Sequence, residues 1–135
     1  MTAPVADLMS KKVVTVNKES TVFDVTRDIL NHDIGCVIVV SEKREIIGIV
    51  TKGDILREAV MKRLDPQKIG VEEIMSKPVV TIEAKDSLAE ASSVMSKHSV
   101  SKLPVVGENQ QLVGIISSTD IVRRAQPKKL AKDMV

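Results

Sequence analysis

The stretch Gly48-Ile-Val-Thr-Lys-Gly-Asp-Ile-Leu-Arg57 decides how this chain is organised, because the chain contains it twice. It returns 66 residues later as Gly114-Ile-Ile-Ser-Ser-Thr-Asp-Ile-Val-Arg123. In both places an apolar run ends at a hydroxyl residue, and a carboxylate follows three positions farther on. This pattern predicts a strand that ends at the hydroxyl residue and a helix that begins near the carboxylate.

The similarity extends over most of the sequence without a gap. At the same offset, 17 of the 56 residue pairs aligned between residues 5 and 126 are identical. The leading segments of the two copies both read Met-Ser-Lys, one further residue and Val-Val-Thr. A repeat of this kind predicts duplicated supersecondary units. We therefore expect repeats at 5–62 and 71–126, a linker at 63–70 and a basic tail at 127–135.

Composition limits the class of protein. Apolar residues make up 43% of the chain and charged residues 28%, which is typical of a globular domain. Phe23 is the only aromatic residue, so bases have no platform for stacking. A net charge of +2 is too small to indicate duplex binding by itself. Composition therefore argues against nucleic-acid binding, although lysines favour it at positions 11, 12, 128, 129 and 132.

The sequence also bears on the cellular compartment. Cys36 is the single cysteine, so no intrachain disulfide is possible, and its apolar surroundings favour a buried hydrophobic role. No apolar run approaches the ~20 residues that span a bilayer, and no signal-peptide pattern is visible. We expect a cytoplasmic protein with no membrane partner.

Each copy has the same expected order of elements: strand, helix, strand, strand, helix. The first strand is expected at 13–16 or 79–82, and the following helix is expected to be capped by Ser20 or Asp86. The last helix is expected to begin near Asp54 or Asp120. The core stripes of the first helices are predicted to be Val22, Val25, Ile29 and Leu30, and Leu88, Ala91, Met95 and Val100; the hairpin strands are 36–40 with 46–50, and 103–106 with 112–116.

This order predicts an α+β fold in which each repeat has a three-stranded sheet flanked by helices. A copy of about 56 residues is rarely stable alone. We therefore expect the two repeats to bury an apolar face against each other, related by a pseudo-two-fold axis.

The strand-to-helix junctions are the candidate binding positions. A helix N-terminus carries unpaired N–H groups and a partial positive charge, which suit a phosphate. A carboxylate beside it can accept both hydroxyls of a ribose. The same Ser/Thr-x-x-Asp pattern is also that of a plain helix cap, and spacing alone favours the cap.

The repeated order of elements, the ending Gly-apolar-apolar-Thr/Ser-x-x-Asp and the Leu-Pro-Val-Val stretch at 103–106 together resemble CBS domains. The resemblance covers residues 5–126. It implies a tandem CBS pair that binds an adenosine derivative (AMP, ADP, ATP, S-adenosylmethionine or an NAD-type ligand) in two clefts between the repeats. In that family the aspartate holds the ribose hydroxyls, the Thr or Ser hydroxyl contacts ribose or phosphate, and the leading segment of the opposite repeat lines the base.

The resemblance implies two sets of nucleotide-binding residues, which we name after their aspartates. The Asp120 site would consist of Ser117, Thr119 and Asp120 with Val5, Met9, Ser10 and Lys11. The Asp54 site would consist of Thr51, Gly53 and Asp54 with Ile74, Met75, Ser76 and Lys77.

The two sites are not expected to be equal. Lys102 precedes Leu103-Pro104, where nucleotide-binding relatives often carry a basic residue for the phosphate, and the matching residue in the first copy is Cys36. Gly53 also replaces Thr119, so a hydroxyl is lost. Lys52 could contact a phosphate instead, but solvent exposure is the favoured interpretation. We expect the Asp120 site to bind a phosphate-bearing ligand more tightly.

Catalysis and metal binding have no comparable support. His32 and His98 occupy the same position in the two copies, and a helix-end role is favoured because no Cys/His/Asp cluster at ligand spacing is visible. No nucleophile–base pair is legible. We expect no enzyme and no catalytic cofactor, but an adenine nucleotide ligand and a regulatory module that signals to a separate effector protein. Relatives associate as flat dimers, so a homodimer is expected. The alternative is a structural or oligomerisation module with non-functional clefts.

Overall fold

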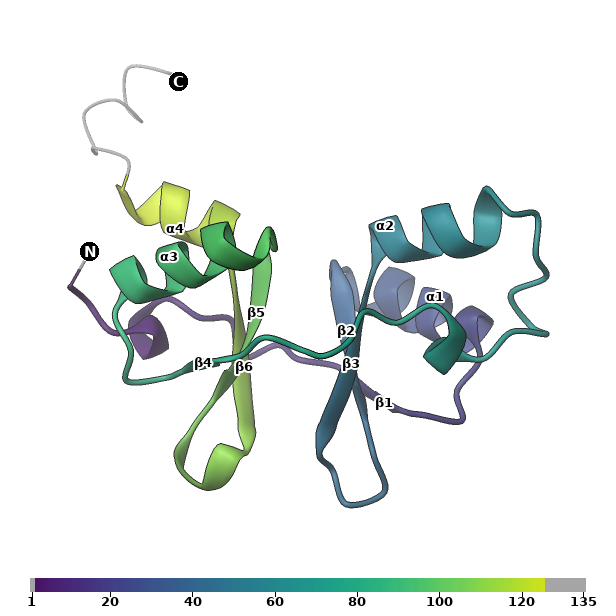
Figure 1. Ribbon diagram of the computed structural model, residues 1–135, viewed down its shortest axis with the longest axis horizontal. Helices are drawn as coiled ribbons and strands as arrows, with labels where there is room; N and C mark the ends of the chain where they lie inside the picture. The colour runs from purple at the N-terminus through teal and green to yellow at the C-terminus, as the bar shows by residue number, and fades with distance from the viewer. Residues whose placement is uncertain (1, 126–135) are drawn as a thin grey trace. The chain divides into compact units, whose positions relative to one another are not determined.

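The structure, a computed structural model, describes residues 2–125 and divides into two compact units. Unit 1 comprises Met1–Lys12 together with Val80–Val135, and unit 2 comprises Val13–Val79. The expected basic tail, with the lysines at 128, 129 and 132, lies outside the described residues. Each unit has its own three-stranded sheet, accompanied by helices (Figure 1).

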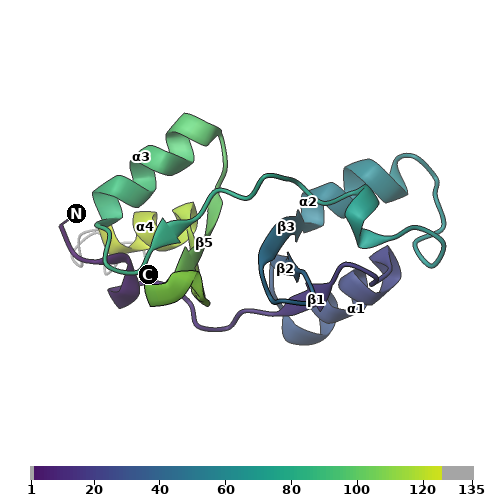
Figure 2. The ribbon, with the colours of Figure 1, turned by 60° about the horizontal axis from the view of Figure 1, so that its bottom comes forward.

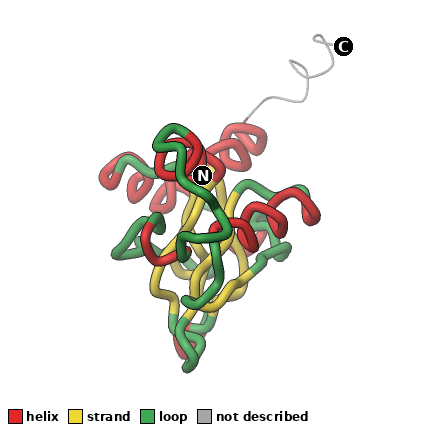
Figure 3. Tube along the Cα trace, turned by 90° about the vertical axis from the view of Figure 1, so that its right-hand side faces the viewer, coloured by secondary structure: helices red, strands yellow, loops and turns green. Residues whose placement is uncertain are grey.

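Unit 2 holds the first sheet, whose strand order is β1-β2-β3. The central strand β2 is parallel to β1 and antiparallel to β3. All five residues of β2 are buried, as expected of a central strand covered on both faces. Figure 3 colours the same chain by element type. The elements are β1 (Thr15–Asn17), α1 (Val22–His32), β2 (Cys36–Val40), β3 (Ile46–Thr51), α2 (Lys52–Ile55) and the π-helical turn η2 (Leu56–Val60), followed by η3 (Val71–Glu73).

Unit 1 repeats this plan with the strand order β4-β5-β6. Again the central strand is parallel to the first strand and antiparallel to the third. The α+β fold with three-stranded sheets and the order strand, helix, strand, strand, helix are therefore confirmed. The elements are η1 (Val5–Asp7), β4 (Ile82–Glu83), α3 (Leu88–His98), β5 (Lys102–Val106), η4 (Glu108–Gln110), β6 (Leu112–Ser117) and α4 (Ser118–Ala125).

Each unit is completed by the leading segment of the other repeat. Val5 is fully buried in the core of unit 1, and its N–H donates to the carbonyl of Asp86 at 2.7 Å. Val71 is fully buried in the core of unit 2, and its N–H donates to the carbonyl of Ser20 at 2.8 Å. The purple N-terminal segment accordingly lies in the unit of α3 and α4 in Figure 2. The repeats of the sequence and the units of the structure thus have different boundaries.

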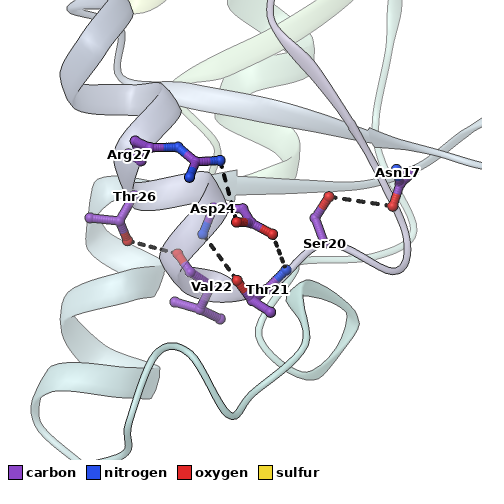
Figure 4. Close-up of polar contacts among 7 residues, drawn as sticks. All are labelled: Asn17, Ser20, Thr21, Val22, Asp24, Thr26 and Arg27. Atoms are coloured by element: carbon purple, nitrogen blue, oxygen red, sulfur yellow. Dashed lines mark hydrogen bonds and ion pairs between the residues drawn. The ribbon is translucent and has the colours of Figure 1, made fainter.

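The expected caps of the first helices are wrong by one residue. Thr21, not Ser20, is the N-cap of α1: its hydroxyl accepts the N–H of Asp24, and the Asp24 carboxylate accepts the N–H of Thr21 (Figure 4). Ser87, not Asp86, is the N-cap of α3. In both copies the two adjacent residues are polar and the second one has the extended backbone that lets its side chain reach the third residue of the helix.

Two predicted core residues and the starts of the first strands also differ from the expectation. Leu30 is 73% exposed, because Val22, Val25 and Ile29 already form the buried stripe of α1. Val100 lies beyond the end of α3 and is 37% exposed. The first strands begin later than position 13 or 79, where β2 and β5 provide a partner. In the part of the chain that the structure describes, no helix has the length and apolarity needed to cross a membrane.

Candidate functional site

Both candidate aspartates cap the helix that follows their strand. Asp54 N–H donates to Thr51 Oγ1 at 3.2 Å, and Asp54 Oδ2 accepts the N–H of Thr51 at 2.9 Å. Asp120 and Ser117 exchange the same two bonds, both at 3.1 Å. The helices therefore begin at Lys52 and Ser118, with the aspartate as the third helical residue rather than the first. Capping uses only one oxygen of each carboxylate, so the other oxygen determines what the junction can bind.

The leading segment of the opposite repeat runs beside each junction. Ser10 and Ile115 form an antiparallel bridge with N–H to carbonyl distances of 2.8 and 2.9 Å. Ser76 and Ile49 form the equivalent bridge in unit 2 at 2.9 and 3.2 Å. These bridges place each Met-Ser-Lys segment beside the end of a strand, two residues before the capping residue. The structure thus brings the two parts of each predicted residue set into one unit.

Glycine allows this close approach. A Cβ atom at Gly114 would lie 2.7 Å from Met9 Sδ and 2.8 Å from the carbonyl oxygen of Ser10. A Cβ atom at Gly48 would lie 2.7 Å from Met75 Cγ. Neither glycine has a positive φ, so space, not backbone conformation, requires them.

Lys102 lies where a basic residue of the Asp120 site is expected. It pairs with Ser117 across β5 and β6, and directly opposed residues have Cβ atoms about 5 Å apart on the same face of the sheet. Cys36 takes the corresponding place opposite Thr51 in unit 2 and is buried. The Asp120 junction therefore has a cation beside its capping hydroxyl, and the Asp54 junction has an apolar side chain at the equivalent place.

The remaining predicted residues differ in accessibility. Val5 and Ile74 are buried in the cores, so they could contact a ligand only at the floor of a site. Met9 and Met75 are half-buried against the sheets. The polar members are the accessible ones. Exposed side chains are Ser10, Lys11, Thr119, Ser76 and Lys77, whereas Ser117, Lys102, Thr51 and Gly53 are partly buried.

A contact that the sequence analysis did not anticipate closes the Asp54 junction. Arg57 Nη2 donates to Asp54 Oδ1 at 3.1 Å, so both carboxylate oxygens have a protein partner. Asp54 is only 7% exposed, whereas Asp120 is half-buried. Among the described residues, no ion pair joins Arg123 to Asp120. Arg57 and Arg123 occupy the same position in the two copies, so the repeat could have suggested such a contact. It does not indicate that only Arg57 forms an ion pair.

A cavity of about 260 Å3 lies elsewhere, between α3 and α4 of unit 1. Its walls carry four serines and the apolar side chains of Met95, Val100, Ile121 and Val122. None of the residues predicted to bind nucleotide lines it, and its volume falls below the roughly 300–1,000 Å3 of small-molecule sites. It is not the predicted nucleotide site.

The histidines lie at helix ends. His32 is the last residue of α1 and His98 the last residue of α3, and both are exposed. Within residues 2–125, no three His, Cys, Asp or Glu side chains gather as metal ligands would.

These features define a tandem α+β module in which each sheet is completed by the leading segment of the other repeat and each last helix begins with an aspartate-containing capping box. The family model of the CBS domain matches residues 5–60 and 71–126. The chain belongs to the CBS domain family, and a CBS pair is a regulatory ligand-binding module.

Solved structures are similar to this chain over nine tenths of its length. A putative signal-transduction protein with CBS domains from Burkholderia ambifaria superposes with a TM-score of 0.81 at 30% identity, covering 90% of this chain and 93% of that chain. The CBS domain pair of protein MJ0100, solved in complex with 5′-methylthioadenosine and S-adenosyl-L-methionine, superposes with a TM-score of 0.81 at 29% identity, covering 92% and 96%.

Curated relatives are longer than this chain. An uncharacterized protein of Methanopyrus kandleri is 32% identical over 119 residues, which are 88% of this chain and 61% of that protein. The chain thus spans about six tenths of the length of two curated relatives that it matches.

Proposed function

We propose that this chain is a non-catalytic sensor of adenine nucleotides that reports ligand occupancy to a separate effector protein. The observation that carries the proposal is the pairing of Ser10 with Ile115, which brings the Met9–Lys11 segment to the junction of Ser117 and Asp120. Adenosine would lie against the aliphatic part of this segment, and its ribose hydroxyls would donate to the uncommitted oxygen of Asp120. The complex of the MJ0100 pair with two adenosine compounds supports this ligand class.

The Asp120 site is the stronger candidate for a ligand with a phosphate. Lys102 and the exposed Lys11 flank it, and charge-assisted hydrogen bonds contribute about 1.5–3 kcal/mol each. Burial of about 150 Å2 of adenine adds roughly 4 kcal/mol at ~25 cal/mol per Å2. After the cost of association, an affinity in the micromolar range, about −8 kcal/mol, is expected.

A thermal-shift titration with AMP, ATP and S-adenosylmethionine tests the proposal. Ligand at 1 mM that binds with a Kd of ~10 μM stabilises the folded state by about 2.7 kcal/mol, which raises Tm by several degrees. Asp120→Asn should remove most of this shift. Asp24→Asn is the matched control, because Asp24 has the same capping geometry at the start of α1 and belongs to neither predicted site. No shift with any of the three ligands would contradict the proposal.

A structural or oligomerisation module is the second candidate, and one observation favours it. Both aspartates already cap their own helices, and the carboxylate of Asp54 is fully engaged. In this case Asp120→Asn would change Tm, and neither the natural chain nor the variant would show a ligand-dependent shift.

The expected homodimer is part of the proposal. In unit 2, α1 leaves Phe23 and Leu30 exposed, and the turn η2 leaves Leu56 and Val60 exposed. We expect a second copy of this chain to cover these side chains. Light scattering should give a dimer mass for the natural chain and a monomer mass for Leu30→Glu with Leu56→Glu, and equal masses would contradict this assembly.

A further inference from the structure

The two junctions differ at Oδ1, the carboxylate oxygen that accepts no capping hydrogen bond. In unit 2, the Arg57 guanidinium holds Oδ1 of Asp54, and only 10% of the Asp54 side chain is exposed. In unit 1, the described residues provide no ion-pair partner for Asp120. The arginine is present in both repeats, as Arg57 and Arg123, so its presence alone does not explain the difference.

The residue before the aspartate differs between the two junctions and affects how closely the arginine can cover the carboxylate. A Cβ atom at Gly53 would lie 2.9 Å from Nη1 of Arg57 and 3.3 Å from Nη2. The guanidinium therefore lies where a Cβ atom at this position would crowd it. Thr119 stands at this position in the second repeat, and by the same geometry its Cβ would crowd an equivalent conformer of Arg123.

A third capping box in the same protein shows the effect of a side chain at this position. In α1 the sequence Thr21-Val-Phe-Asp24 has Phe23 where Gly53 stands, and Arg27 lies over the Phe23 ring, 5.9 Å from its centroid. Arg27 still reaches Asp24 at 3.3 Å, but 39% of the Asp24 side chain stays exposed (Figure 4). Glycine thus lets the arginine cover the carboxylate as well as pair with it.

We propose that Arg57 is an internal competitor that occupies the ribose-binding carboxylate of the Asp54 site, so that an adenosine ligand must displace it. This inference rests on the proposed function. It makes Gly53 and Arg57 the residues that set the difference between the two sites, in addition to the missing cation at Cys36. The Arg57 side chain is 67% exposed, so it can swing into solvent without disturbing the core.

Calorimetric titrations with two probes test the competitor. They use AMP and 5′-methylthioadenosine, which has the ribose hydroxyls but no phosphate, in a full-length Asp120→Ala background that leaves only the Asp54 site. Surface ion pairs of this kind are worth a factor of about 1.4 to 5 in an equilibrium constant. Arg57→Met should therefore tighten binding of both probes, by up to about five-fold.

Two further variants sharpen the result. Gly53→Ala should tighten binding similarly, because its Cβ contacts only the Arg57 guanidinium within 3.4 Å and alanine is favourable in a helix. Arg27→Met removes the other Arg–Asp pair of a capping box and should leave both affinities unchanged.

The outcomes separate the two proposals. Unchanged affinity in Arg57→Met would overturn the competitor, and so would weaker AMP binding with unchanged 5′-methylthioadenosine binding, which would make Arg57 a phosphate ligand. Either result would leave the sensor intact, because the chain would still bind the ligands. Absence of binding in every chain, including the natural one, would overturn both the sensor and the competitor.

Discussion

Gly114 is a point of close approach between the leading segment and the sheet of unit 1. An alanine there would place its Cβ 2.8 Å from the backbone carbonyl of Ser10, which cannot turn away as a side chain can. Gly114→Ala should therefore separate Ser10 from Ile115 and cost about 1–3 kcal/mol, as overpacking does. The urea midpoint measures the loss. Gly70→Ala is the control, since its Cβ would approach no atom closer than 3.8 Å; equal losses in both variants would contradict this explanation.

Asp24 makes the stability of unit 2 depend on pH. The backbone N–H of Thr21, then the Thr21 hydroxyl and the Arg27 charge, lower the pKa of Asp24 below its ordinary value. A carboxyl whose folded pKa is lowered stabilises the fold above its unfolded pKa of about 3.9 and loses this contribution as the pH falls through the folded pKa.

Asp24→Asn removes this titration. The urea midpoint of the variant should lie below that of the natural chain at pH 6.5, and the difference should shrink when both are measured near pH 3. A difference of the same size at both pH values would show that the ionisation of Asp24 contributes nothing.

Sequence reasoning identified the residues of the junctions better than their contacts. Thr51, Asp54, Ser117 and Asp120 could be singled out because their pattern repeats. The change from Thr119 to Gly53 was interpreted as the loss of a hydroxyl, whereas in the structure the loss of a Cβ also admits the Arg57 guanidinium. Such a contact depends on the space around one rotamer, which residue spacing alone does not specify.

The helix caps show the same limit for whole elements. The apolar runs and their polar turns predicted the hairpins β2–β3 and β5–β6 well, because a central strand must be continuously apolar. The caps of α1 and α3 were placed one residue early, since two adjacent polar residues can both cap a helix and only the local backbone selects one of them.

The cap of α1 can be tested by comparing neighbouring variants. Thr21→Ala removes the acceptor of the Asp24 N–H and should cost about 1 kcal/mol. Ser20→Ala removes only a 3.4 Å hydrogen bond to Asn17 and should stay within about 0.5 kcal/mol of the natural chain. Denaturant unfolding measures both, and a larger loss in Ser20→Ala would restore the sequence-based assignment.

For the whole molecule, the boundaries of the repeats and of the units make different predictions about which fragment folds. A fragment of residues 5–62 would contain Val5 without the unit 1 core into which it packs. It would also lack the residues after position 62 that complete unit 2. The structural unit 13–79 contains Val71 and Ile74, which are buried against the first sheet, and Ile69, which packs beside them. Burial of one such side chain contributes about 1.5–3 kcal/mol, a large share of the stability of so small a domain.

A fragment of residues 13–79 should therefore unfold cooperatively when its far-UV circular dichroism is followed with temperature, whereas a fragment of residues 5–62 should not. Val71→Ala in the 13–79 fragment serves as the matched control. It removes two buried methyl groups and leaves a cavity, so it should lower Tm sharply or abolish the transition. Cooperative unfolding of 5–62, or an unchanged Tm in Val71→Ala, would mean that each repeat of the sequence is self-sufficient and that the exchanged leading segments contribute little to either core.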